Sequence, residues 1–176
     1  SWQFTLVDPD NRRPMDFGKL TPLLKQQETP SKELINRLLN TIENGHIKLF
    51  ITAAILKERN KTPQLFESGD YLPILGDGDY ADHVVAFGRE WHDNQSHQTH
   101  RLMVITPRLL ASLLDNSNEL PQGNSVWQET VLQLPSEWEG LHFEDIFTGA
   151  KVTIESDRLK VSHCLKNSPV AILRQV

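Results

Sequence analysis

The chain has 176 residues, of which 38% are hydrophobic and 23% charged, a balance typical of a globular protein with one good core. Its net charge of −5 is spread along the chain without a basic block, which argues against nucleic acid or an anionic membrane as a partner. The single cysteine, Cys164, excludes an internal disulfide and a cysteine-rich zinc site, and it fits a reducing, cytoplasmic compartment.

The beginning of the chain indicates a fragment, because Ser1 rather than Met opens it and aromatic, strand-like sequence follows at once. We expect no signal sequence here. No apolar run approaches the roughly 20 residues that a bilayer span requires, so we also expect no membrane helix.

A polar stretch follows, LVDPDNRRPMDF, with the chemistry of a loop, because proline fixes φ and short Asx side chains bond the nearby backbone. The ring of Pro14 favours an extended conformation before it, so Arg12 and Arg13 are expected to point to opposite sides. Two interpretations stay open. The stretch is either a solvated turn whose exposed ion pairs contribute about 0–1 kcal/mol, or a site where guanidinium donors and carboxylate acceptors hold sugar hydroxyls.

Two helical patterns come next. The first is predicted to begin at Thr29-Pro30, with threonine as its cap, and to end at Asn44-Gly45. The second runs from Ile47 to Leu56 and ends before Pro63, and the short turn between the two predicts antiparallel neighbours. Because the second helix is apolar on too many sides for a surface helix, we expect it to lie against a larger body.

After Gly69 the hydrophobic period changes from helical to strand-like. The predicted strands are short, bounded by Gly, Asp, Asn or Pro, and span residues 71–75, 83–87, 102–106, 130–134, 141–147, 151–155 and 169–173. Residues 76–79 predict a tight connection, and the leucines after Pro107 a short helical turn. The sequence therefore predicts an α+β fold, with a helical N-terminal arm (1–68) followed by an antiparallel β-sandwich (69–176).

Histidines gather in the segment REWHDNQSHQTHR, which contains His92, His97 and His100. Zinc needs ligands held at fixed geometry, and this segment has the composition of a long hairpin loop, which favours solvated side chains over a metal site. His163 and Cys164 juxtapose a base and a thiol, but adjacent residues on extended chain point apart. We therefore expect Cys164 to pack in the core.

Two further candidates involve tryptophan. Glu137 and Glu139 flank Trp138 and are a conceivable glycosidase pair, but PSEWEG has the composition of an exposed turn, where a carboxyl pKa is little shifted. Trp127 and Trp138 either form a platform for sugar rings or plug the end of the sandwich, and the second interpretation is favoured. Taken alone, the residues define no active centre.

Several stretches in chain order carry a resemblance to a known family: FTLVDPDNRRPMDF, GHIKLFITAAILKERNKTPQLFESGDYLPI, ADHVVAFGRE, VWQETVLQLP, FEDIFTG and SPVAIL. Together they resemble the C-terminal end of maltooligosyltrehalose synthases, a branch of the α-amylase superfamily. The resemblance spans nearly the whole chain and is weakest over residues 92–100.

The resemblance implies a larger parent enzyme on a (β/α)₈ barrel that rearranges the reducing-end α-1,4 bond of a maltooligosaccharide to an α,α-1,1 bond. The implied chemistry is a retaining displacement by an aspartate, with a glutamate as acid and base and a second aspartate assisting, and it needs no cofactor or metal. All three carboxylates would precede Ser1, so this chain would contain no catalytic residue and be inactive alone. Its expected partners are the missing barrel and, through it, the maltooligosaccharide.

By the same resemblance, residues 1–17 would form the loop after the eighth barrel strand, at the face where barrel active sites lie. Substrate-binding residues are then expected in this loop, with one of its two arginines in direct contact with sugar: Asp8, Asp10, Asn11, Arg12 and Arg13. The two helices would close the barrel, and the remainder would be the sandwich that follows it.

Two further expectations accompany this interpretation. The alternative function is a stand-alone carbohydrate-binding or protein-interaction sandwich. Without its barrel, the helical face that carries Phe50, Ile51 and Ile55 should fray, self-associate or pack back on the sandwich, because large apolar patches become covered.

Overall fold

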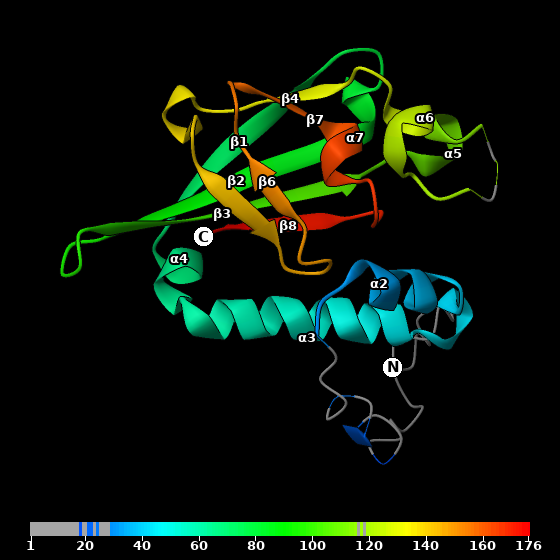
Figure 1. The fold of residues 1–176 in the computed structure, drawn as a ribbon, viewed down its shortest axis with the longest axis horizontal. Coiled ribbons are helices and arrows are strands. Elements are labelled where there is room, and N and C mark those ends of the chain that lie inside the picture. The colour runs from blue at the N-terminus through cyan, green and yellow to red at the C-terminus, as the bar shows by residue number, and fades with distance from the viewer. Residues whose placement is uncertain (1–17, 19–20, 23, 25–28, 116, 118) are drawn as a thin grey trace, which may run out of the picture.

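The chain places a layer of helices against one face of a curled antiparallel sheet, as the computed structural model in Figure 1 shows. The structure describes residues 18, 21–22, 24, 29–115, 117 and 119–176. The helical layer consists of α2 (Lys32–Leu39), α3 (His46–Lys61) and α4 (Pro63–Glu67). The strands are β1 (Asp70–Asp77), β2 (Val84–Asp93), β3 (Gln98–Pro107), β4 (Val131–Gln133), β5 (His142–Asp145), β6 (Lys151–Thr153), β7 (Arg158–Lys160) and β8 (Ala171–Gln175).

Shorter elements connect the strands, namely the helices α5 (Leu110–Leu113), α6 (Gly123–Trp127) and α7 (Val161–Cys164) and the 3₁₀ turns Ala81–His83 and Ser136–Trp138. No helix within the described ranges is long and apolar enough to cross a membrane.

Helix α2 begins two residues later than predicted. Ser31, not Thr29, is its N-cap: the Ser31 hydroxyl accepts a hydrogen bond from the Leu34 amide at 3.1 Å. Serine ranks above threonine as an N-cap, and the extended backbone of Ser31 places its hydroxyl over the first turn. Helix α2 ends at Leu39, before the predicted stop at Asn44-Gly45. Gly45 adopts a left-handed φ of 74° and instead separates the 3₁₀ turn Ile42–Asn44 from α3.

The sheet has the order β6-β5-β8-β3-β2-β1-β4-β7, with antiparallel neighbours throughout. Strand β1 turns a corner, since residues 70–74 pair with β2 and residues 75–77 pair with β4. The edge strands β6 and β7 are consecutive in the chain. The connection between them forms hydrogen bonds with the residue before β5 and with the residue after β4. Ile154 donates its amide to the Leu141 carbonyl at 2.9 Å, and Leu134 donates to Asp157 at 2.7 Å. The sheet therefore curls so that the short connection 154–157 joins its two edge strands.

The antiparallel, β-rich character of the predicted C-terminal domain is confirmed. It takes the form of one continuous sheet, so the predicted division into the two stacked sheets of a sandwich is not confirmed. The assignment of the helices to a barrel and the boundary near residue 69 stay predictions.

Both faces of the central strands β3 and β8 are buried, because successive strand residues point to opposite sides. Met103 and Leu173 point into the curl, where they join a core that includes Trp127, Trp138 and Phe143. Leu102 and Ile172 point to the other side and pack with residues of the helical layer and its surroundings: Ile35, Ile47, Leu65, Ile146 and Phe147.

The helical layer is packed back on the sheet, one of the three outcomes expected for the apolar face of α3. Phe50, Ile51 and Ile55 are half-buried against the second cluster, and the Phe50 ring lies 6.3 Å from that of Phe147. Arg89 on β2 ties α4 to the sheet by donating to the carbonyls of Leu65 and Phe66 at 3.2 and 2.8 Å. A cation at a helix C-terminus is favourable.

One local prediction was wrong, and one strand was not predicted. Residues 76–79 do not form a tight hairpin, because β1 leaves β2 after Ile74 and continues alongside β4, so the chain reaches β2 through a 3₁₀ turn. Strand β7 was missed because it is short, with charged residues on both sides of a single buried one, Leu159.

Candidate functional site

The predicted substrate-binding residues lie outside the described residues. They are Asp8, Asp10, Asn11, Arg12 and Arg13, and their role at the rim of a sugar site stays a prediction. The other candidate residues lie within the described ranges, and the structure shows the surroundings of most of them.

Trp127 and Trp138 are core residues, as the favoured interpretation expected, and they form no sugar platform. Both side chains are completely buried, and each indole N–H has a partner: Trp127 donates to the Pro121 carbonyl at 2.9 Å and Trp138 to Glu90 at 3.3 Å. Gly88 provides the space, because a Cβ at that position would lie 2.7 Å from the Trp138 ring. The expected exposed turn is confirmed, since Glu137 and Glu139 point to solvent around the 3₁₀ turn.

The histidine-rich segment forms a hairpin, as predicted, but its loop is short, because β2 and β3 pair without interruption up to Asp93 and Gln98. Its strands are polar on both faces near the tip, so they lack the apolar alternation that marks a strand. Asp93 closes the turn by accepting from Ser96 Oγ at 2.6 Å and the Gln95 amide at 2.9 Å, and these bonds lower the pKa of Asp93.

The histidines of this hairpin have separate partners. His92 Nδ1 lies 3.0 Å from Thr99 Oγ1, and the His100 ring stacks on Trp91 with centroids 5.5 Å apart. Nowhere in the described part of the chain do three or more His, Cys, Asp or Glu side chains gather in a way that could hold a metal ion.

Cys164 packs in the inner core, as expected, while His163 beside it is exposed. Burial and the nearby charge of Asp145 raise the pKa of the Cys164 thiol to about 12. The thiol is therefore protonated at neutral pH and is no nucleophile.

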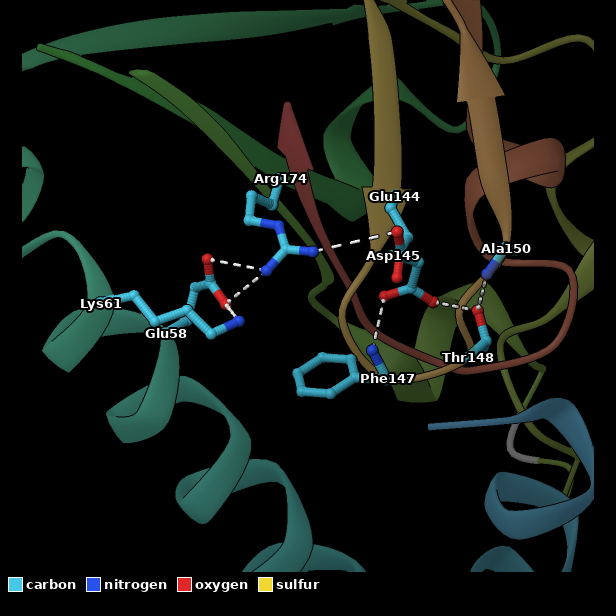
Figure 2. Close-up of polar contacts among 8 residues, drawn as sticks. All are labelled: Glu58, Lys61, Glu144, Asp145, Phe147, Thr148, Ala150 and Arg174. Atoms are coloured by element: carbon cyan, nitrogen blue, oxygen red, sulfur yellow. Dashed lines mark hydrogen bonds and ion pairs between the residues drawn. The ribbon is translucent and has the colours of Figure 1, made fainter. Parts of the chain in front are cut away.

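The motif FEDIFTG folds into a corner built around a buried carboxylate. Asp145 accepts from the Phe147 amide at 3.2 Å and from Thr148 Oγ1 at 2.5 Å, and Thr148 in turn accepts from the Ala150 amide at 3.3 Å (Figure 2). Burial raises the pKa of Asp145 above its usual value, although these hydrogen bonds act in the opposite direction. The corner presents Phe147 to α3, so its role is structural.

A chain of ion pairs joins the helical layer to the sheet beside this corner. Glu58 on α3 is only 6% exposed and accepts from Lys61 at 2.8 Å and from Arg174 on β8 at 3.2 Å. Arg174 extends the chain to Glu144 on β5 at 3.9 Å, as Figure 2 shows. Sequence reasoning missed Glu58, because it appears as one charge among several at the end of an amphipathic helix.

A pocket of about 440 Å³ opens next to these ion pairs, where the end of α3 faces the start of β3 and the end of β8. Arg101 on β3 reaches it, and its guanidinium donates to Glu90 at 2.5 Å and to Gln175 at 3.2 Å. Most of the residues that line the pocket are polar or charged, although their exposed surface is about as apolar as it is polar: Glu58, Thr62, Leu65, Gln98, Thr99, His100, Arg101, Arg174, Gln175 and Val176. The pocket is thus a site of mixed polarity between layers, held in shape by bonds from three elements.

The chain folds as a domain of helices and antiparallel strands. Comparisons with known proteins identify proteins that are similar to it in sequence or in fold. No protein-family model matches the chain. Two curated relatives from strains of Mycobacterium tuberculosis, both provisionally named maltooligosyl trehalose synthase, are 39% identical over 88 residues. These residues make up 50% of the chain and 9% of each relative.

A solved structure of a mutant maltooligosyltrehalose synthase from Arthrobacter ramosus has the same fold. The TM-score is 0.65 at 24% identity, over 97% of the chain and 18% of that protein. The resemblance to maltooligosyltrehalose synthases is therefore confirmed as a partial one, since the chain spans less than a fifth of the length of each of these proteins.

Proposed function

We propose that the chain is the C-terminal portion of an enzyme that rearranges the reducing-end α-1,4 linkage of maltooligosaccharides to an α,α-1,1 linkage by intramolecular transfer of a glucosyl unit. The similarity to proteins named maltooligosyl trehalose synthase, at 39% identity over half of the chain, carries this proposal. Because the matched segment is 9% of those relatives, we place the barrel and its catalytic carboxylates in the remainder of the parent.

Within this enzyme the chain has a structural role. Retaining hydrolysis or transfer requires two carboxyl groups about 5–5.5 Å apart on either side of an accessible bond. The buried acids of the described ranges, Glu58 and Asp145, are both engaged otherwise. Glu58 accepts from two cations, and Asp145 closes its own turn. These commitments support a chain without catalytic carboxylates of its own.

Helix α3 supports the proposed contact with a barrel. Its sheet-facing side is used in the second cluster, and a further apolar stripe, Leu49, Ala53 and Leu56, follows the helix at a spacing of four and three residues. Leu56 is 52% exposed. A helix that is apolar on two sides fits between two bodies better than at a surface.

The substrate contact that we propose for this chain lies in residues 8–13, at the rim of the barrel site. One of Arg12 and Arg13, whose side chains are expected to diverge, donates to sugar hydroxyls. Measurement of maltopentaose turnover by the full-length parent tests this: either Arg12→Ala or Arg13→Ala should lower kcat/KM. Unchanged kcat/KM in both variants would remove the loop from the site.

Reconstitution tests the proposed function itself. The 176-residue chain and the remainder of the parent are purified separately and mixed, and trehalose-capped product is quantified. The chain alone should produce none, and the mixture should regain activity that the remainder lacks. Product from the chain alone would overturn the proposal.

The alternative is a stand-alone carbohydrate-binding or protein-interaction module. The two tryptophans that were candidates for its sugar platform are core residues and do not support it. A parent gene that encodes no barrel would restore this alternative.

A further inference from the structure

We propose that the pocket between α3, β3 and β8 is a binding site for an uncharged polyhydroxylated ligand, with a short maltooligosaccharide as its natural probe. The choice of this probe rests on the proposed function, whereas the ligand class follows from the pocket. Its volume of about 440 Å³ falls within the range of about 300–1,000 Å³ that small-molecule sites occupy.

The lining contains both donors and acceptors. The carboxylate of Glu58 accepts, the guanidinium groups of Arg101 and Arg174 donate, and the amides of Gln98 and Gln175 do both. The hydroxyl of Thr62 adds a group that reorients to suit a partner. A sugar hydroxyl is itself both donor and acceptor, so a ring with several hydroxyls matches this lining at more positions than a ligand with one polar group.

The charges of the lining are already compensated, which favours a neutral ligand over an ion. Glu58 is bonded to Lys61 and Arg174, and Arg101 is bonded to Glu90, so each of these charged side chains has an opposite partner within 3.2 Å. An anion would have to compete with these carboxylates for the same guanidinium groups. A neutral hydroxyl can instead use the remaining lone pairs and N–H groups, because each guanidinium has five donors.

The polar groups of the pocket are also preorganised. The Glu58 side chain is 7% exposed and that of Arg101 is 14% exposed, and each is held by two partners. His100 is fixed by stacking on Trp91, and Thr99 lies within hydrogen-bond distance of His92. A ligand therefore orders few side chains on binding, which is the main route by which a polar site gains affinity.

A purely structural role for the ion pairs leaves the cavity unexplained. A tie between helix and sheet requires only that Glu58 and Arg174 meet, and close packing normally fills the space around such a pair. Moreover, Glu58 lies in the last turn of α3, where the helix dipole disfavours a carboxylate. Lys61 and Arg174 nevertheless hold the Glu58 carboxylate beside the pocket.

Titration of the isotope-labelled 176-residue chain with maltotriose, followed by two-dimensional NMR, tests the proposal. Backbone amides of residues 98–101 and 174–176 should shift in a saturable manner, with Kd on the order of 1 mM, about −4 kcal/mol. Saturable shifts confined to other parts of the chain, or no shifts, would overturn it. Inorganic phosphate is the counter-probe: if phosphate shifts these amides and maltotriose does not, the site is an anion site and the proposal is wrong.

Two pairs of variants assign the binding to named side chains. Gln98→Ala should weaken maltotriose binding about fivefold, the value of one hydrogen bond, while Gln95→Ala in the same hairpin, outside the lining, should leave it unchanged. Glu58→Gln should weaken binding about tenfold, and Glu129→Gln, in an ion pair with Lys160 outside the lining, should not. If Glu58→Gln fails to fold, the glutamine pair still decides: equal affinities for Gln98→Ala and Gln95→Ala would contradict the site.

The outcome is separable from the proposed function. Reconstituted activity without maltotriose binding by the chain would refute the pocket alone. Binding without reconstitution would refute the structural role and leave the pocket in place.

Discussion

The two faces of β3 and β8 are both buried, yet they are buried in different ways. On the inner face the side chains of Met103 and Leu173 are fully enclosed in an apolar core. The indole N–H groups of the two tryptophans in this core are both hydrogen-bonded. On the outer face the apolar contact with α3 extends along only part of the strands and gives way to the Glu58–Arg174 pair and an open pocket. The inner face should therefore dominate stability, and the outer face has room for recognition.

The largest expected effect separates the two faces with one kind of substitution. Phe143 is completely buried in the inner core, and Phe50 is half-buried in the outer contact. Phe143→Ala should lower the free energy of unfolding by about 3–5 kcal/mol, and Phe50→Ala by about 1–3 kcal/mol. Urea denaturation of both variants measures the difference. Equal losses would mean that the packing of the helical layer contributes as much to stability as the inner core does.

The next effect concerns the ion pair across the outer contact. Arg174→Ala leaves the buried Glu58 with Lys61 alone and should cost about 1–3 kcal/mol. Replacing both partners, as in Glu58→Leu with Arg174→Leu, should lower the free energy of unfolding less than Arg174→Ala does, because the double variant leaves no buried charge without a partner. Thermal unfolding of the single and double variants checks this. A double variant less stable than the single one would show that the pair itself is strongly stabilising.

A smaller effect depends on pH. Because burial raises the folded-state pKa of Asp145 above the usual 3.8, the folded chain binds this proton more tightly than the unfolded chain. The contribution of Asp145 to the free energy of unfolding is thus most favourable at low pH. This contribution decreases as pH rises from about 3.8 through the raised pKa, and above the raised pKa it no longer changes with pH.

The substitution Asp145→Asn removes the titratable carboxyl group and retains an oxygen that accepts from the Phe147 amide. The difference in free energy of unfolding between wild type and variant should therefore change with pH over this window, in favour of the variant as pH rises. Urea titrations at a series of pH values measure the difference. A difference independent of pH would contradict the raised pKa.

The smallest effect is expected at the surface. Glu129 and Lys160 form an ion pair of 2.8 Å, but the Glu129 side chain is 79% exposed. Glu129→Gln should change the free energy of unfolding by about 0–1 kcal/mol. A loss as large as that of Arg174→Ala would show that burial does not distinguish the two pairs.

The sequence alone determined the order and type of most elements. Hydrophobic period separated helices from strands near Gly69, the break before α3 at Gly45 was visible, and Cys164 was expected in the core. Long motifs also carried the family resemblance that the comparisons confirmed. These features are local, because each is written in the spacing of neighbouring residues.

Only the tertiary structure decided what lies far apart in the chain and close together in space. The corner in β1, the closure of the sheet at residues 154–157 and the burial of Trp138 beneath Gly88 depend on strand pairings that no local pattern encodes. The same holds for Glu58, which meets Arg174 across 116 positions of sequence. A charge at a helix end appears solvated until the sheet that covers it is known, so the pocket belongs to the packing of layers rather than to any one segment.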